Sequence, residues 1–223
     1  MGRRFLSLLA LALGFVLVGC GTAVPTGNVE PVAVPAIPGA PLLAYLKSFQ
    51  SGVGAVVALS GDAFVELFPA SGDVLLRRAG QENVFWILDR SNGVVYRHDL
   101  RSKRLDRPHY RDRGANIQDI HRASDDSHWI SALNRTAIVR VNDDGEIVEN
   151  VSLDHLAARD ARGLAYPTFF WSAAGRTFLL VQRLRDGIRP SELSYVVELA
   201  AGKGLVGEPH PLSKTNPFSA WVA

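Results

Sequence analysis

The polar pair best suited to chemistry is Asn116 and Asp119, in the segment Asn116-Ile-Gln-Asp-Ile120. Amide and carboxylate oxygens are the ligands that calcium prefers, so this pair could contribute to a metal site. His121 follows directly, and we include it with them as a candidate binding residue. The simpler alternative is that Asp119 caps a turn or bonds neighbouring backbone groups.

A basic run with one aromatic residue lies just before this segment. Its members are Arg101, Lys103, Arg104, Arg107, His109, Arg111 and Arg113, interrupted by Asp106 and Asp112, with Tyr110 inside it. Such a run can bind phosphate or an acidic glycan, and Arg111 and Arg113 are its candidate binding residues. The alternative is an ordinary solvated loop.

No complete catalytic or metal-binding motif is present. The histidines are His98, His109, His121, His128, His155 and His210, and they form neither HExxH nor HxH. No serine lies in a Gly-x-Ser-x-Gly setting. The acidic pairs Asp125-Asp126 and Asp143-Asp144 lack the spacing of an EF-hand loop and are typical of turns. We therefore predict no catalytic residue, no metal site and no cofactor.

Composition narrows the function classes further. The chain has 223 residues, 47% hydrophobic and 21% charged, which is enough for a buried core. Lys and Arg number 24 against 22 Asp and Glu. Without Arg3 and Arg4, in a segment predicted to be removed, the charges balance, which argues against nucleic-acid binding. The single cysteine, Cys20, excludes an intrachain disulfide framework.

The N-terminus reads as an export signal. Two arginines precede the apolar run Phe5–Val18, which is too short to span a bilayer but fits a signal peptide. The boundary Leu17-Val18-Gly19-Cys20 resembles a bacterial lipobox, which implies lipid on Cys20 and a membrane as partner. Gly21 then favours the outer over the inner membrane. We predict a signal peptide over 1–19, a Pro-rich tether with a short helix over 20–49, and one folded domain over 50–223.

From about residue 53 the apolar segments have the length and composition of strands. They are Val53–Leu59, Ala63–Phe68, Val84–Leu88 and Val94–His98. Asn92-Gly93 and Asp144-Gly145 predict hairpins with type I′ turns. Helical periodicity is confined to Leu42–Phe49 and Leu153–Arg159, each about two turns at most.

An internal repeat predicts the architecture. Phe85–Asp99 aligns with His128–Asn142 at a constant offset of 43, which matches Trp86 to Trp129 and Arg97 to Arg140. A third copy lies at Arg176–Gln182 and Ser194–Leu199, and a degenerate one within 53–78. Units of this length with several strands are typical of β-propeller blades; a β-sandwich would show no such repeat. Trp86, Trp129, Trp171 and Phe178 are the expected core between blades.

The order of several motifs resembles the YncE-like, WD40-type seven-bladed propeller lipoproteins of bacterial cell surfaces. These motifs are Asn116–Ile120, Trp129–Ser131, Gly163–Pro167, Leu180–Leu184 and Leu212–Phe218. The resemblance implies an all-β propeller fold and leaves the activity open. The chain has room for only about four blades, so we expect the faces near Val56-Val57 and Phe218–Trp221 to stay uncovered and to promote self-association or a protein partnership.

These features together favour a lipid-anchored propeller that acts as a non-enzymatic binding or scaffold module at the cell envelope. Two alternatives remain. One is a calcium-dependent propeller hydrolase or lactonase, and the other is a truncated propeller with no independent activity.

Overall fold

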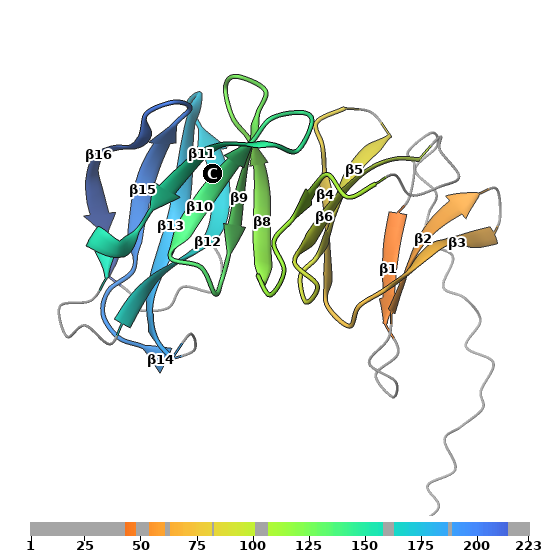
Figure 1. The fold of residues 1–223 in the computed structure, drawn as a ribbon, viewed down its shortest axis with the longest axis horizontal. Coiled ribbons are helices and arrows are strands. Elements are labelled where there is room, and N and C mark those ends of the chain that lie inside the picture. Colours follow the sequence, from red (N-terminus) through yellow and green to blue (C-terminus); the bar gives the residue numbers. More distant parts are fainter. Residues whose placement is uncertain are drawn as a thin grey trace, which may run out of the picture. The chain divides into compact units, whose positions relative to one another are not determined.

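The computed structural model describes residues 43–47, 54–60, 63–81, 83–100, 107–157, 163–186 and 189–213. The chain there is all-β, as predicted, and its strands form four antiparallel sheets that follow one another in chain order (Figure 1). We call these sheets blades 1 to 4. Cys20, the tether and Phe218–Trp221 lie outside the described residues.

Each blade is built from consecutive strands. Blade 1 contains β1 (Leu43–Lys47), β2 (Gly54–Ser60) and β3 (Ala63–Ala70), and blade 2 contains β4 (Val74–Arg78), β5 (Val84–Asp89), β6 (Val94–Asp99) and β7 (Tyr110–Arg111). Blade 3 contains β8 (Ile117–Arg122), β9 (His128–Ala132), β10 (Ala137–Val141) and β11 (Ile147–Ser152). Blade 4 contains β12 (Gly163–Ala173), β13 (Arg176–Arg185), β15 (Tyr195–Ala200) and β16 (Gly204–Pro211), and β14 (Arg189–Pro190) pairs with β13.

The 43-residue repeat corresponds to real blades. Trp86 on β5 pairs with Arg97 on β6, and Trp129 on β9 pairs with Arg140 on β10 in the same way. The third copy forms β13 and β15 of blade 4. The degenerate copy predicted within 53–78 is only partly confirmed. Strands β2 and β3 belong to blade 1, but β4 pairs with β5 of blade 2, so the boundary between these blades falls before Val74.

Alternating residues of the second strand in a blade face its two neighbours. On β5, Trp86 and Leu88 join a buried cluster with Ile117 and Ile130 of blade 3, whereas Ile87 packs with Val56 of blade 1. Trp129 likewise joins a cluster with residues of blade 4. The core is therefore a series of apolar layers between blades, which holds the ends of neighbouring strands in fixed positions.

The second aromatic pair differs from the expectation. Trp171 and Phe178 are half-buried cross-strand partners that stack with ring centroids 5.7 Å apart, and they lie outside the buried clusters. The Arg176 guanidinium lies 5.1 Å from the Phe178 ring centroid. This pair stabilises the end of one hairpin and does not join two blades.

The two segments with helical periodicity differ in outcome, and the short helix predicted near residues 42–49 is wrong. Residues 43–47 form strand β1, paired with β2 over its full length, because a long-range strand partner outweighs weak local helical periodicity. At Leu153–Arg159 the described residues hold a single 3-10 turn, Asp154–Leu156. None of the helical segments among the described residues is long and apolar enough to cross a bilayer.

The two predicted hairpins are present, but their turns are not type I′. Only the glycines have positive φ, 63° at Gly93 and 81° at Gly145. Asn92 donates its backbone N–H and its side-chain amide to the Asp89 carboxylate, at 3.3 and 2.9 Å. This side-chain capping holds the first turn in a conformation that needs positive φ at one residue only.

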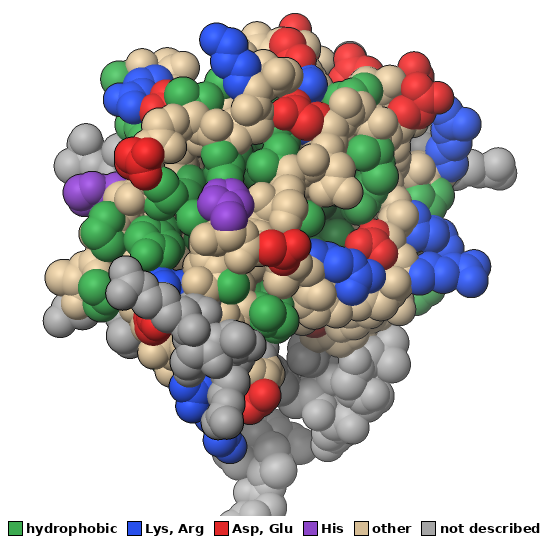
Figure 2. Space-filling view, turned by 60° about the vertical axis from the view of Figure 1, so that its left-hand side comes forward, with side chains coloured by type: hydrophobic (Ala, Val, Ile, Leu, Met, Phe, Trp, Pro, Cys, Tyr) green, Lys and Arg blue, Asp and Glu red, His purple; other side chains and the backbone are tan. Residues whose placement is uncertain are grey.

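Val56 and Val57 are 0% and 5% exposed, so the expectation of an uncovered face at this end is wrong. On the face in view in Figure 2, positive and negative side chains are interspersed, with hydrophobic side chains between them.

Candidate functional site

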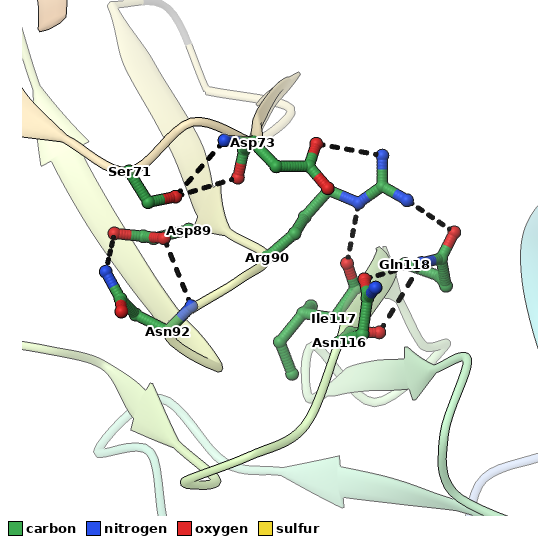
Figure 3. Close-up of polar contacts among 8 residues, drawn as sticks. All are labelled: Ser71, Asp73, Asp89, Arg90, Asn92, Asn116, Ile117 and Gln118. Carbon is green, nitrogen blue, oxygen red and sulfur yellow. Dashed lines mark hydrogen bonds and ion pairs between the residues drawn. The ribbon is translucent and has the colours of Figure 1, made fainter. Parts of the chain in front are cut away.

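The segment Asn116–Gln118 contacts blade 2 through Arg90 (Figure 3). Arg90, which follows β5, donates from Nε to the Ile117 carbonyl at 3.1 Å and from Nη2 to Gln118 Oε1 at 2.9 Å. Its Nη1 lies 3.4 Å from Asp73 Oδ1. The Gln118 amide in turn donates to Asn116 Oδ1 at 2.8 Å. The Asn116 side-chain oxygen is therefore engaged within its own segment, by the glutamine that Arg90 binds.

Asp119 connects three consecutive blades. It lies on β8, only 4% exposed. Oδ1 accepts hydrogen bonds from Arg77 Nε of blade 2 and from the Ile120 backbone N–H, both at 3.0 Å. Oδ2 accepts from the Phe170 backbone N–H of blade 4, also at 3.0 Å. Both oxygens are thus engaged by protein donors, which matches the simpler sequence interpretation.

His121 belongs to the interface between blades 3 and 4. Its Nε2 lies 2.7 Å from the Ser172 hydroxyl, and its ring stacks on Phe170 with centroids 6.0 Å apart. Burial lowers the pKa of His121, and the nearby Asp119 charge opposes that shift only in part. Among the described residues, no three His, Cys, Asp or Glu side chains gather as metal ligands would.

Arg111 and Arg113 lie apart from these three residues, at the outer side of blades 2 and 3. They line two neighbouring cavities of about 420 and 400 Å³, which we call the rim groove. Both side chains are exposed, and neither pairs with a carboxylate among the described residues. The structure therefore separates the five predicted binding residues into an inner group and a rim pair.

Apolar walls and one ion pair complete the rim groove. Arg135 donates to both oxygens of Asp112, at 2.9 and 2.8 Å, so its charge is balanced. The apolar lining residues are Ile117, Ile130, Ala132, Ala137, Val139 and Ile147. Ile147 is 57% exposed. Because β7 has only two residues, blade 2 does not cover this part of blade 3. The groove thus offers free positive charge beside exposed apolar surface.

A second cleft was missed by sequence reasoning. Trp86 lies between His109 and His128, with ring centroids 4.8 and 4.7 Å away, and the two imidazoles are 6.1 Å apart. A cavity of about 220 Å³ opens beside these rings. Its lining residues are Ala79, Gln81, Trp86, Arg97, Arg122, Asp126, His128 and Asp143. We call it the Trp86 cleft.

The imidazoles of this cleft are neutral at neutral pH. Burial lowers the pKa of His109, and burial together with the neighbouring His109 lowers the pKa of His128 to about 4. His109 Nε2 and His128 Nδ1 are buried and have no hydrogen-bond partner among the described residues. Such unsatisfied nitrogens are costly and are retained where they serve a purpose.

We expect the free energy of unfolding to decrease as the pH is lowered from about 6.5 to about 4. The reason is that the pKa of His128 is about 4 in the folded chain and near 6.5 in the unfolded chain. The unfolded chain binds the proton first, so this stabilisation is complete above about pH 6.5 and is lost as the pH falls. Urea unfolding across this range measures it. The variant His128→Gln should reduce this pH dependence of the free energy of unfolding, and the control variant His155→Gln, at an exposed position, should not. A wild-type free energy of unfolding that does not decrease over this pH range would contradict the prediction.

Comparisons with known proteins address the fold. No family model matches the sequence, and no curated protein matches it. Dihydro-heme d1 dehydrogenase NirN has a TM-score of 0.50 and 16% identity over 77% of this chain and 35% of its own. The calcium-binding protein regucalcin from Agrobacterium tumefaciens has a TM-score of 0.47 and 15% identity, over 78% of this chain and 61% of its own.

The fold is that of a β-propeller. Virginiamycin B lyase from Staphylococcus aureus is a further similar structure, with a TM-score of 0.44 and 14% identity over 79% of this chain and 75% of its own. At 16% identity, the likeness to NirN shows the fold alone. The chain spans 61% and 35% of the lengths of regucalcin and NirN.

Proposed function

We propose that the protein is a lipid-anchored, non-enzymatic binding module of the cell envelope, and that it binds an acidic polypeptide segment in the rim groove. The observation that carries the proposal is that Arg111 and Arg113, beside an apolar groove, pair with no carboxylate in the part of the chain that the structure describes. The resemblance of Leu17–Cys20 to a lipobox supports the anchor, and the propeller lipoproteins that the motif order resembles support the location.

Two properties of the groove select this partner. Two free guanidinium groups attract carboxylates and recognise them through paired hydrogen bonds. The half-buried Val139 and the exposed Ile147 favour a partner that also carries apolar side chains, which an acidic glycan lacks. A peptide that alternates acidic and apolar residues presents both along an extended backbone.

We expect a labelled peptide of alternating Glu and Leu to bind the full chain in detergent, and the double variant Arg111→Glu/Arg113→Glu to weaken binding by about tenfold or more. Added salt should weaken it as well, because the groove charges are exposed. Fluorescence anisotropy measures both effects.

The matched control is Arg189→Glu/Lys203→Glu, which makes the same change in net charge at exposed positions of blade 4. It should leave the affinity close to that of the wild type. A Lys-Leu peptide should not bind. Equal loss in both double variants would mean that net charge, and not the rim groove, recognises the peptide.

We expect Cys20→Ser to abolish lipid attachment, since a serine hydroxyl cannot replace the thiol that accepts the diacylglyceryl group in the lipobox pattern. The precursor should stay uncleaved and should lose radiolabelled lipid. Mass spectrometry of the wild-type N-terminus is the direct check, and a mature N-terminus without lipid would contradict the anchor.

A calcium-dependent hydrolase or lactonase is not favoured. The sequence-based case for it depended on Asn116 and Asp119. The Asn116 side-chain oxygen accepts from Gln118 of the same segment, and both Asp119 oxygens accept from protein donors of blades 2, 3 and 4.

A further inference from the structure

We propose that the Trp86 cleft binds a small zwitterion that carries one ammonium and one carboxylate group, as a free α-amino acid does. This ligand and this site are separate from the acidic segment and the rim groove. The geometry that points to it is a cation and an anion that line one small cleft and form no ion pair with any described residue.

The cation is Arg97 on β6, and the anion is Asp143 in the turn between β10 and β11. The only hydrogen bond of the Arg97 side chain to a described residue goes from Nη2 to Gln81 Oε1, at 2.7 Å. Asp143 pairs with no cation among the described residues. The Arg97 charge lowers the pKa of both His109 and His128, and the Asp143 charge raises it. The two charges therefore lie near the same pair of imidazole rings.

The internal repeat shows that Arg97 differs from its counterpart. Arg140 holds the same position in blade 3, opposite Trp129. It is only 8% exposed and is neutralised by Asp125 at 2.5 Å and Glu149 at 2.7 Å. Arg97 is exposed and has no carboxylate partner among the described residues. In blade 3, ion pairs within the protein therefore occupy the arginine at this repeat position. In blade 2, the equivalent residue, Arg97, is available to a ligand.

The turn that carries Asp143 is held in place. Asn142 Oδ1 accepts hydrogen bonds from the backbone N–H groups of Asp144 and Glu146, at 3.1 and 2.9 Å. Gly145 packs so closely on the loop before β7 that a Cβ there would lie 1.6 Å from the His109 carbonyl oxygen. The turn therefore holds the Asp143 carboxylate against blade 2 before any ligand binds. This favours binding, because little conformational entropy is lost when the ligand enters.

The size of the cleft sets the size of the ligand. At roughly 30 Å³ for each water-sized group, a volume of about 220 Å³ holds about seven non-hydrogen atoms. Glycine, alanine and serine are of this size. Trp86 and His128 form a buried wall of the cleft.

The experiment is calorimetric titration of the full chain in detergent with L-serine. We expect one site per chain, and a loss of affinity of about fivefold or more in Arg97→Gln and in Asp143→Asn, since each replaces a charged group that pairs with the ligand by a neutral amide. 3-Hydroxypropanoate, which lacks the ammonium, and ethanolamine, which lacks the carboxylate, are both smaller than L-serine and should each bind more weakly by a similar factor. Arg189→Gln, at an exposed position of blade 4, should bind like the wild type.

Three results would overturn the proposal. The first is the absence of binding heat from L-serine at about 10 mM, a concentration that would fill even a weak site of millimolar Kd. The second is equal affinity for L-serine and for either single-charge analogue. The third is an unchanged affinity for L-serine in either cleft variant. Thermal unfolding of each variant confirms that the chain is folded, which is expected because both substituted side chains are exposed.

Discussion

Replacing Asp119 by alanine is expected to lower the free energy of unfolding by about 2–5 kcal/mol. The substitution leaves the buried N–H groups of Ile120 and Phe170 without acceptors, and each unsatisfied group costs about 1–3 kcal/mol. Arg77 also loses its partner, but its side chain is 40% exposed and water can hydrate it. Urea unfolding of the wild type and the variant measures the difference.

The control is Asp126→Asn. Asp126 pairs with Arg122 at 2.6 Å on the surface, where both side chains are more than half exposed. Such a pair contributes only about 0.2–1 kcal/mol, and asparagine, like aspartate, tolerates the left-handed φ of 68° at this position, so this variant should unfold much like the wild type. If Asp119→Ala were as stable as Asp126→Asn and instead lost calcium binding, the inner group would be a metal site and our account of it would be wrong.

The second large effect is expected at Gly145. Gly145→Ala adds a Cβ that must displace the His109 backbone, because the two atoms would lie 1.6 Å apart, and it forces alanine to a φ of 81°. The left-handed conformation alone costs roughly 1–2 kcal/mol. With the displacement of the loop, we expect a loss of about 3 kcal/mol or more in the free energy of unfolding.

Gly175→Ala separates the two causes. Gly175 has a similar φ of 74°, but a Cβ there meets nothing within 4 Å. It should therefore cost only the conformational penalty of about 1–2 kcal/mol. Equal losses in the two variants would show that the contact between Gly145 and His109 does not stabilise the interface of blades 2 and 3.

Much of the fold could be predicted from local sequence signals. The offset between Trp86 and Trp129 identified equivalent strands, because each blade repeats the same alternation of buried faces. Residues 43–47 were missed as a strand, since the pairing of β1 with β2 is a tertiary contact that no local pattern records. The turn type at Asn92-Gly93 depended on the Asp89 carboxylate, which lies outside the dipeptide that predicts the hairpin.

The candidate sites were harder to predict for a related reason. The segment Asn116–Asp119 was recognised, but its role is set by Arg77, Arg90 and Phe170, which come from two other blades. The Trp86 cleft joins Trp86, His109 and His128 from three separate segments, so no motif spacing marks it. Only the unequal surroundings of Arg97 and Arg140 distinguish the open repeat from the closed one, and that difference is visible only in the structure.

Self-association of the chain stays a prediction. The burial of Val56 and Val57 removes one of the two surfaces from which it was argued. Light scattering of the detergent-solubilised chain tests what remains of it, and a monodisperse monomer would contradict it.

Hydrogen–deuterium exchange, with and without the Glu-Leu peptide, tests the proposed function most directly. Our account predicts slower exchange at Tyr110–Arg111 and Ile147–Ser152, the strands beside the rim groove, and no such change in the variant Arg111→Glu/Arg113→Glu. Protection confined to blade 4, or protection that persists in the double variant, would show that the peptide binds elsewhere and would contradict the account.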